Sequence, residues 1–312
     1  MKRKSLKLLA SALLVTVMGV GMLGCGSSSD AGNAAGNSTE GTKQEQKLEG
    51  SITISGSSAL LPLMEQSIEK FNEKYPDVEI SAQAGGSGTG LTQVLDGTVN
   101  IGNSDIFAED KLEKDQASQL VDHKVVAQGF AVTVSKSLGI DSLTKDQIKD
   151  IFSGKVTNWN QITKADGTTG PDKEIFVVHR KSGSGTRATF EEKILDGDKS
   201  LENDSIGVMQ DSNGAVLTAM KQNDGAISYL GLAYMNTDEA KEALTMVSID
   251  GKSAETANIC DGSYPFWSWG HMYTKGEPDE VSKAFIDFIS SDENKESLEN
   301  LSFISGNEMK TK

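Results

Sequence analysis

Arginine is scarce in this sequence. After Arg3 the chain contains only Arg180 and Arg187, and both lie in one short segment, His179-Arg-Lys-Ser-Gly-Ser-Gly-Thr-Arg187. All other cations are lysines, and the formal net charge is −15. A guanidinium offers a planar fork of N–H donors that suits phosphate or carboxylate. An acidic chain that places both arginines beside one Gly/Ser turn is therefore expected to carry a local anion site there.

Cysteine and histidine are also rare, with two and three residues respectively. If Cys25 is lipidated, as argued below, only Cys260 remains, which excludes an internal disulfide and predicts a small buried apolar residue. The histidines, His123, His179 and His271, form no cluster with metal-ligand spacing, so we expect neither a metal nor another cofactor. The acidic charge repels nucleic acid and argues against a DNA or RNA partner.

No apolar run is long enough to predict a membrane span. The run 8–23, about sixteen residues, follows a positively charged start and ends in Met22-Leu-Gly-Cys25, which resembles a bacterial lipoprotein cleavage box. We predict a signal peptide over 1–24 and a palmitate-bearing lipid anchor on Cys25, which would hold the protein on the outer face of the cell membrane. An ordinary secretion signal with a chance cysteine, or an uncleaved anchor, remains the alternative. Residues 25–47 lack bulky apolar side chains and predict a flexible linker.

The remainder of the chain alternates between strand-like and helix-like segments. We expect strands over 51–54, 78–82, 125–134, 174–179 and 226–229, with a brief one beginning at 101. Helices are expected over 59–75, 90–95, 145–152, 186–195, 213–223 and 280–290, with a short helix after the last. This order predicts an α/β fold, with parallel sheets as the default.

Three turns between strand and helix share one chemistry. They cover residues 55–58, 85–90 and 182–186, and each offers hydroxyls and small residues at an expected helix start. Free N–H groups at such a start bind anions, and glycine lets the backbone approach a ligand. A single turn of this kind is more simply read as a helix cap. Three turns, one of them with both arginines, predict a shared cage of N–H, O–H and guanidinium donors.

The turns match no nucleotide-binding or hydrolase motif. There is no G-x-x-x-x-G-K-[ST] segment, and 86–90 does not read G-x-G-x-x-G. Neither Ser87 nor Ser184 sits in G-x-S-x-G, and no pair of acidic residues is singled out as a glycosidase pair. We therefore expect a protein that is not an enzyme.

Asp105 follows the second turn, where a carboxylate would repel an anion. It becomes favourable if the ligand carries a proton, since hydrogen phosphate can donate to a carboxylate whereas fully ionised sulfate cannot. A plain aspartate that caps a turn at a strand end explains the residue equally well. The chemistry of the residues alone leaves both interpretations open.

Five motifs together resemble the phosphate-binding lipoproteins of bacterial ABC importers, of the Gram-positive type. The resemblance covers about residues 50–310, and the motifs are Gly56-Ser-Ser-Ala-Leu-Leu-Pro62, Ala84-Gly-Gly-Ser-Gly-Thr-Gly-Leu91, Ile101-Gly-Asn-Ser-Asp-Ile-Phe107, His179-Arg-Lys-Ser-Gly-Ser-Gly-Thr-Arg187 and Asp211-Ser-Asn-Gly214. It implies a two-lobe periplasmic-binding-protein fold of type II with the ligand cleft between the lobes. The two hinge strands would cross near 128–134 and 260–267. Lobe one would cover 48–131 and 265–312, and lobe two 132–264.

The resemblance also implies roles for individual residues. Asp105 matches the carboxylate that accepts the phosphate proton, and Arg180 matches the arginine that pairs with phosphate. The implied donors around them are Ser57, Ser58, Ala59, Leu60, Ser87, Ser184, Gly185 and Thr186. Some relatives carry an acidic residue where Ser182 stands, which leaves open what orients Arg180. Arg187 is expected to lie behind the site or to form an interlobe salt bridge.

The predicted function is capture of inorganic phosphate by a monomeric receptor that delivers it to an ABC permease. The receptor would touch the membrane only through its lipid anchor. A receptor for sulfate or molybdate is the alternative within the same class. A phosphate-ester hydrolase using Ser87 or Ser184, and a sensory or adhesive surface protein that keeps the fold, are the alternatives outside it.

Overall fold

The computed structural model describes residues 47–311. The predicted signal peptide, Cys25 and nearly all of the predicted linker lie outside the described residues. Within 47–311, none of the helices combines the length and apolar character needed to cross a membrane.

The described residues form one ten-stranded mixed sheet and one small sheet. The central path of the large sheet runs β2-β1-β3-β11-β4-β8-β6-β7, and β9 and β12 also pair with β4. Its strands are β1 (Gly50–Gly56), β2 (Val78–Ala84), β3 (Ile101–Ser104), β4 (Leu120–Ser135), β6 (Phe176–Arg180), β7 (Val208–Gln210), β8 (Ala226–Gly231), β9 (Leu244–Met246), β11 (Trp267–Lys275) and β12 (Phe303–Ser305). The small sheet pairs β5 (Ser142–Leu143) with β10 (Ser248–Ile249).

Two long strands connect the two halves of the large sheet. β4 pairs antiparallel with β11 from Leu120 to Gly129, and then antiparallel with β8 from Phe130 to Val134. The backbone N–H of Phe130 donates to the carbonyl of Phe266 at 3.0 Å, just before β11 begins. The parallel default holds for β1 with β2 and β3, and for β6 with β7 and β8. It is wrong for β4 and β11, which are antiparallel to each other and to β8 and β3, respectively.

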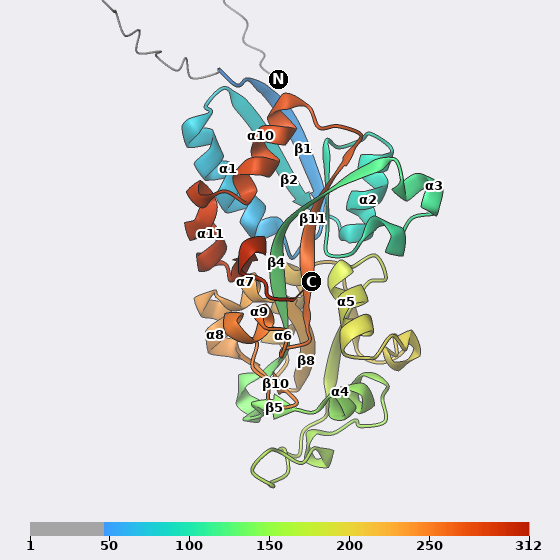
Figure 1. Ribbon diagram of the computed structural model, residues 1–312. Coiled ribbons are helices and arrows are strands. Elements are labelled where there is room, and N and C mark those ends of the chain that lie inside the picture. Colours follow the sequence, from blue (N-terminus) through green and yellow to red (C-terminus); the bar gives the residue numbers. More distant parts are fainter. Residues whose placement is uncertain (1–46, 312) are drawn as a thin grey trace, which may run out of the picture. The chain divides into compact units, whose positions relative to one another are not determined.

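Helices cover the first lobe on both faces of its sheet. Figure 1 shows α1 (Leu61–Lys74), α10 (Glu280–Ile289) and α11 (Lys295–Asn300) on one side, with α2 (Ser87–Leu95) and α3 (Lys114–Ala117) on the other. Apolar residues at helical spacing place Leu63, Met64 and Phe71 of α1 in the core, where Phe71 meets the Phe285 ring at 5.3 Å.

The second lobe has its own apolar core. Its helices are α4 (Lys145–Phe152), α5 (Gly185–Lys193), α6 (Asn213–Lys221), α7 (Leu232–Met235), α8 (Asp238–Ala243) and α9 (Thr256–Cys260). Phe190 of α5 stacks on Tyr229 of β8 with ring centroids 4.2 Å apart, and Phe152 packs against both. Cys260 is buried and unpaired, and burial raises the pKa of its thiol. The observed architecture is thus the predicted two-lobe α/β fold.

Most predicted elements are present with shifted ends. α4 has the predicted bounds, whereas α2 begins at Ser87 rather than Gly90, and β4 begins at Leu120 rather than Val125. The α2 shift matters for function, because it makes Ser87 the first residue of the helix rather than a loop residue. The short elements, such as α3, α7 and β9, were not predicted, since they have too few residues to show a hydrophobic period.

Candidate functional site

The three Gly/Ser turns lie together in the structure. The backbone N–H of Gly88, in the second turn, donates to the carbonyl of Gly183, in the third, at 3.1 Å. Thr186 of the third turn donates through Oγ1 to Asp105 Oδ2 at 3.3 Å, and Ser87 Oγ accepts from the Asp105 N–H at 3.0 Å. The first turn reaches the same carboxylate through Ser57. Turns that are far apart in the sequence therefore surround Asp105.

Asp105 is a buried acceptor at the centre of this group. Ser57 Oγ and Gln128 Nε2 both donate to Oδ1, the latter at 2.8 Å. Burial raises the pKa of the carboxyl, while the hydrogen bonds from Ser57 and Gln128 and the charge of Arg180 act in the opposite direction. The side chain is therefore not a turn cap at a strand end. It is a buried side chain that is placed to accept hydrogen bonds from several turns.

Arg180 ends β6 and is almost completely buried, with 1 % of its surface exposed. Nη2 donates to Ser58 Oγ at 3.2 Å and to the carbonyl of Asp211 at 3.1 Å. Nε and Nη1 have no hydrogen-bond partner among the described residues. Burial lowers the pKa of the guanidinium, and leaving two buried charged donors unpaired is costly unless an acceptor comes to them. The sequence leaves open what orients Arg180, because Ser182 stands where some relatives have an acidic residue. In the structure the carbonyl of Asp211 accepts from Nη2 and helps to orient the guanidinium.

Helix N-termini surround the same space. α2 begins at Ser87 and α5 at Gly185, where Ser184 is the cap and accepts from the N–H of Arg187 at 3.2 Å. α6 begins at Asn213, whose Nδ2 lies 3.4 Å from Thr186 Oγ1. The first amides of these helices lack acceptors within the helix and carry partial positive charge. The arrangement supplies neutral donors where an acidic protein would otherwise repel an anion.

Near the start of α1, the backbone N–H groups of two predicted donors point toward a neighbouring hydroxyl. The N–H groups of Ala59 and Leu60 donate to Ser57 Oγ at 3.1 and 3.3 Å. The Leu60 side chain lies in the core of the first lobe, so only its backbone is available to the site. The structure brings all ten predicted site residues into one buried neighbourhood.

Two glycines allow the turns to come this close. A Cβ on Gly185 would lie 2.1 Å from Ser87 Oγ and 2.8 Å from Asp105 Cβ. Gly86 has φ +83°, and a Cβ there would lie 2.8 Å from the carbonyl oxygen of Gly183. No other residue fits either position without moving a neighbouring turn.

Arg187 does not form an interlobe salt bridge. Its Nη1 donates to the carbonyl of Arg180 at 2.7 Å and to Asp204 at 2.8 Å, and its Nε to Glu191 at 2.7 Å. Nε also lies 3.4 Å from Glu202, a buried carboxylate that accepts from Tyr229 and lies 3.1 Å from His179 Nδ1. All these partners belong to the second lobe, so Arg187 lies behind the site and holds the backbone of Arg180.

Three contributors to the site were not singled out from the sequence. Gln128 lies in a predicted strand, and Asn213 lies inside one of the quoted motifs without an assigned role. Tyr234 carried no signal at all; its hydroxyl donates to the carbonyl of Ser58 at 2.8 Å. Nothing in the spacing of these residues shows that they face Asp105 or Ser58. The contact of Gln128 depends on how β4 crosses the sheet, and those of Asn213 and Tyr234 depend on how the lobes meet.

A cavity of about 400 Å³ reaches Asp105 between the lobes. Phe107, Trp267 and Trp269 line it from the first lobe and the crossing strand, and Thr189 lines it from the second. Lys124 Nζ lies 4.9 Å from the centre of the Trp269 ring. The aromatic cluster thus borders the interlobe cleft next to the candidate site.

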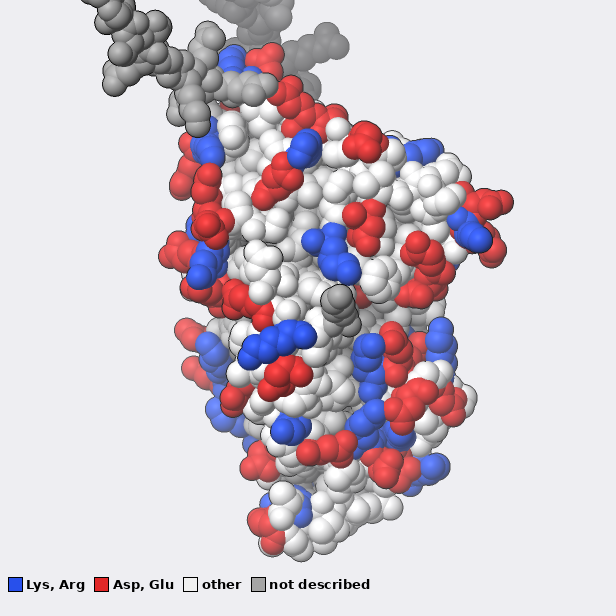
Figure 2. Space-filling model, viewed as in Figure 1, with Lys and Arg blue, Asp and Glu red and all other residues white. Residues whose placement is uncertain are grey.

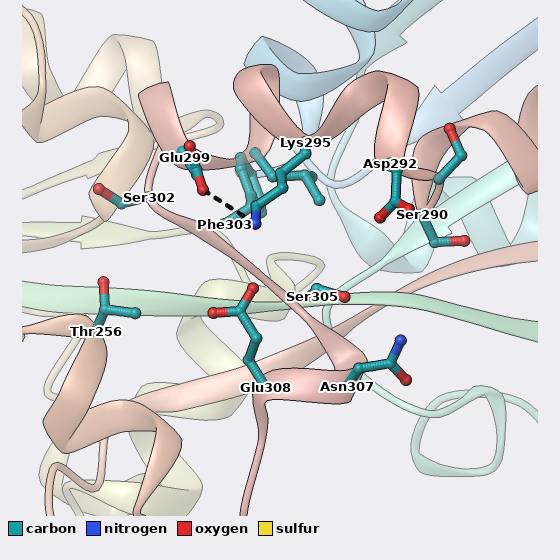
Figure 3. A pocket seen from close by; sticks show the side chains of 12 residues that line it. Thr256, Ser290, Asp292, Lys295, Glu299, Ser302, Phe303, Ser305, Asn307 and Glu308 are labelled. Atoms are coloured by element: carbon teal, nitrogen blue, oxygen red, sulfur yellow. Dashed lines mark ion pairs between the residues drawn. The ribbon is translucent and has the colours of Figure 1, made fainter.

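The cavity in Figure 3, about 320 Å³, is a poor match for an anion. Asp292, Glu299 and Glu308 line it together with one cation, Lys295, which lies 3.7 Å from Glu299. In Figure 2, acidic and basic side chains are mixed over the face drawn, so this face has no broad positive surface that could attract an anion away from the cage. Within the described part of the chain, no group of His, Cys, Asp and Glu could hold a metal.

Comparisons with known proteins identify the family of the chain. A family model described as a PBP superfamily domain matches residues 37–293. The phosphate-binding protein PstS of Bacillus subtilis is 41 % identical over 286 residues, which cover 92 % of this chain and 90 % of that protein. A Clostridium perfringens structure, described as a phosphate ABC transporter substrate-binding protein with bound phosphate, is 32 % identical with a TM-score of 0.73, covering 82 % of this chain and 99 % of its own.

A more distant solved structure supports the fold alone. The ABC-type phosphate transport receptor of Vibrio cholerae is 24 % identical with a TM-score of 0.61, and the match covers 82 % of this chain and 100 % of that one. The family model spans most of the chain, and the B. subtilis relative matches nearly all of it. The chain therefore belongs to the PBP superfamily and, within it, to the family of phosphate-binding proteins named PstS.

Proposed function

We propose that the protein captures inorganic phosphate between its two lobes and delivers it to an ABC permease. One observation carries this proposal: a buried arginine with two unpartnered donors shares a cage with a buried carboxylate. The unpartnered Nε and Nη1 donors of Arg180 require an acceptor, and the carboxylate of Asp105 can accept a hydrogen bond from an O–H group. Hydrogen phosphate or dihydrogen phosphate satisfies both, because each offers anionic oxygens together with at least one O–H.

Asp105 is proposed as the group that selects phosphate. Sulfate and molybdate are tetrahedral and negative, yet when fully ionised they have no proton to donate. Such an ion would bring its charge against a buried carboxylate without a hydrogen bond between them, which costs binding free energy. Phosphate instead donates to Asp105, so the same residue attracts one oxyanion and rejects another.

The donors proposed for phosphate come from both lobes. The first lobe offers Ser57, Ser58, the backbone of Ala59 and Leu60, and Ser87, while the second offers Arg180, Ser184, Gly185 and Thr186. The proposed lobes cover 48–131 with 265–312, and 132–264. Closure of the lobes would complete the cage, and opening would release the ion at the permease.

The protein is further proposed to be a non-catalytic, monomeric lipoprotein on the outer face of the cell membrane. The cleavage box that ends at Cys25 supports the anchor, and the names of the relatives support a role in transport rather than catalysis. Failure to hydrolyse p-nitrophenyl phosphate is the matching expectation for the purified protein.

Titration calorimetry tests the proposal directly. Protein stripped of ligand is titrated separately with phosphate, sulfate and molybdate at neutral pH. Phosphate should bind far more tightly than the other two. Asp105→Asn should narrow the difference in affinity between phosphate and sulfate, because the amide carries no negative charge and its NH₂ group can donate to sulfate. A wild-type protein that prefers sulfate, or an Asp105→Asn variant with unchanged selectivity, would contradict the proposed role of Asp105.

A further inference from the structure

Ser58 of the first lobe accepts from three residues of the second lobe, because Asn213 and Tyr234 supply three donors in addition to Arg180 Nη2. The backbone N–H and Nδ2 of Asn213, at the start of α6, donate to Ser58 Oγ at 3.1 and 3.0 Å. The hydroxyl of Tyr234, in α7, donates to the Ser58 carbonyl at 2.8 Å. We refer to Ser58, Asn213 and Tyr234 as the Ser58 seam. Its bonds connect the lobes without passing through a ligand.

The seam lies where small apolar residues of the two lobes pack against each other. Ala59 packs into the apolar core of the second lobe, and Ala233, next to Tyr234, packs into the core of the first. A Cβ on Gly231 would lie 3.4 Å from Ala59 Cβ, so small residues let the two backbones approach. Ser58 and Asn213 are buried. A hydrogen bond in such surroundings is costly to leave unmade.

Tyr234 acts on a peptide plane that belongs to the cage. The carbonyl of Ser58 and the N–H of Ala59 are parts of one planar peptide group, so fixing the carbonyl also fixes the direction of the N–H. That N–H is one of the proposed phosphate donors, and in this structure it donates to Ser57 Oγ at 3.1 Å. Burial raises the pKa of Tyr234 to about 12, so the phenol keeps its proton, and the bond persists, at neutral pH.

We infer that Tyr234 is a positioning residue that reaches across from the second lobe, fixes the Ser58–Ala59 peptide and prolongs the closed state. The inference rests on the proposed phosphate function. Because Ser58 and Tyr234 belong to different lobes, lobe opening that separates them would break the bond, so the bond should slow the release of phosphate and leave its capture nearly unchanged. Asn213 assists by holding the Ser58 hydroxyl and by accepting from the N–H of Gly231 at 3.0 Å through Oδ1.

The test uses Tyr234→Phe, which removes only the phenolic hydroxyl. Calorimetry with inorganic phosphate gives the affinity, and chase of bound radioactive phosphate with excess unlabelled phosphate gives the dissociation rate. We expect affinity to fall about 3- to 10-fold, the equivalent of one neutral hydrogen bond, carried almost wholly by faster dissociation. Tyr273→Phe is the matched control, because its hydroxyl accepts from the Ala108 N–H at 3.0 Å within the first lobe.

The outcomes separate this inference from the proposed function. If the wild-type protein does not bind phosphate, the proposed function fails and the inference with it. If the wild type binds and Tyr234→Phe releases phosphate at the wild-type rate, the positioning role is overturned while the function stands. A lower melting temperature of the ligand-free variant without faster release would likewise overturn it, because that pattern belongs to a purely structural side chain.

Discussion

Replacing Arg180 by methionine should weaken phosphate binding roughly 10²- to 10⁴-fold without unfolding the protein. Methionine keeps much of the length and apolar volume of the side chain but removes every N–H donor. In the structure Nε and Nη1 of Arg180 are buried without partners, whereas Nη2 is shared between Ser58 and the carbonyl of Asp211. The donors that would serve a ligand are thus the ones that the folded protein does not use.

The magnitude follows from those two donors. A hydrogen bond to a charged group contributes about 1.5–3 kcal/mol, so two of them to phosphate amount to about 3–6 kcal/mol, or roughly 10²- to 10⁴-fold in affinity. The free energy of unfolding of the ligand-free protein should change much less than the affinity, because two effects oppose each other. Removing a buried, incompletely paired charge relieves a desolvation cost, which offsets the loss of the two Nη2 bonds.

Calorimetry and thermal unfolding, each with and without phosphate, measure both effects. The wild-type melting temperature should rise with phosphate, because the ligand binds only the folded state, and that of Arg180→Met should not. Lys181→Met is the matched control. Lys181 is the adjacent cation, but its side chain is 61 % exposed and lies 3.9 Å from Asp211, so its loss should change affinity little. A variant Arg180→Met that binds phosphate within tenfold of wild type would refute the reasoning.

Three further results are expected. Gly185→Ala should weaken phosphate binding at least about 100-fold by calorimetry, because the new Cβ would meet Ser87 Oγ at 2.1 Å and displace the turn; near-normal affinity would show that the turns need not be this close. Burial raises the pKa of the Asp105 carboxyl in the folded protein above its pKa in the unfolded chain. The stabilisation that the protonated carboxyl gives to the ligand-free protein is therefore complete below the pKa of the unfolded chain, and it is lost as the pH rises through the pKa of the folded protein. Denaturant unfolding across that range should show the loss in wild type and not in Asp105→Asn. Arg187→Met should destabilise the protein by about 3–5 kcal/mol in the same assay, because it removes the cation beside the buried carboxylate of Glu202; a loss below 1 kcal/mol would contradict this account.

The parts of the site that the sequence predicts are those encoded locally. Ser184 caps a helix and Gly185 begins it, and both properties can be read from a few neighbouring residues. The same holds for the turn before α2, although its helix begins at Ser87, three residues earlier than predicted. Convergence of the turns could also be anticipated, because all three end strands at helix starts.

The parts that were missed depend on contacts between distant segments. Gln128 lies in the middle of β4, and only the antiparallel course of that strand shows that its amide meets Asp105. The Asp211 carbonyl that orients Arg180 is a backbone atom, which no choice of residue reveals. Tyr234 lies in a helix of four residues, too short to predict from periodicity. In each case the partner is fixed by topology rather than by local pattern.

The scarcity of arginine now has a physical explanation. Arg187 is matched by three carboxylates, Glu191, Glu202 and Asp204, and these ion pairs leave none of its positive charge for a ligand. It fixes the backbone of Arg180 instead, through the bond from Nη1 to the Arg180 carbonyl. Arg180 keeps two donors unpaired, and the other donors of the cage are neutral hydroxyls and amides. Because the donors that attract an anion are neutral groups and one buried guanidinium, the attraction is short-ranged. The affinity for phosphate should therefore depend only weakly on salt concentration.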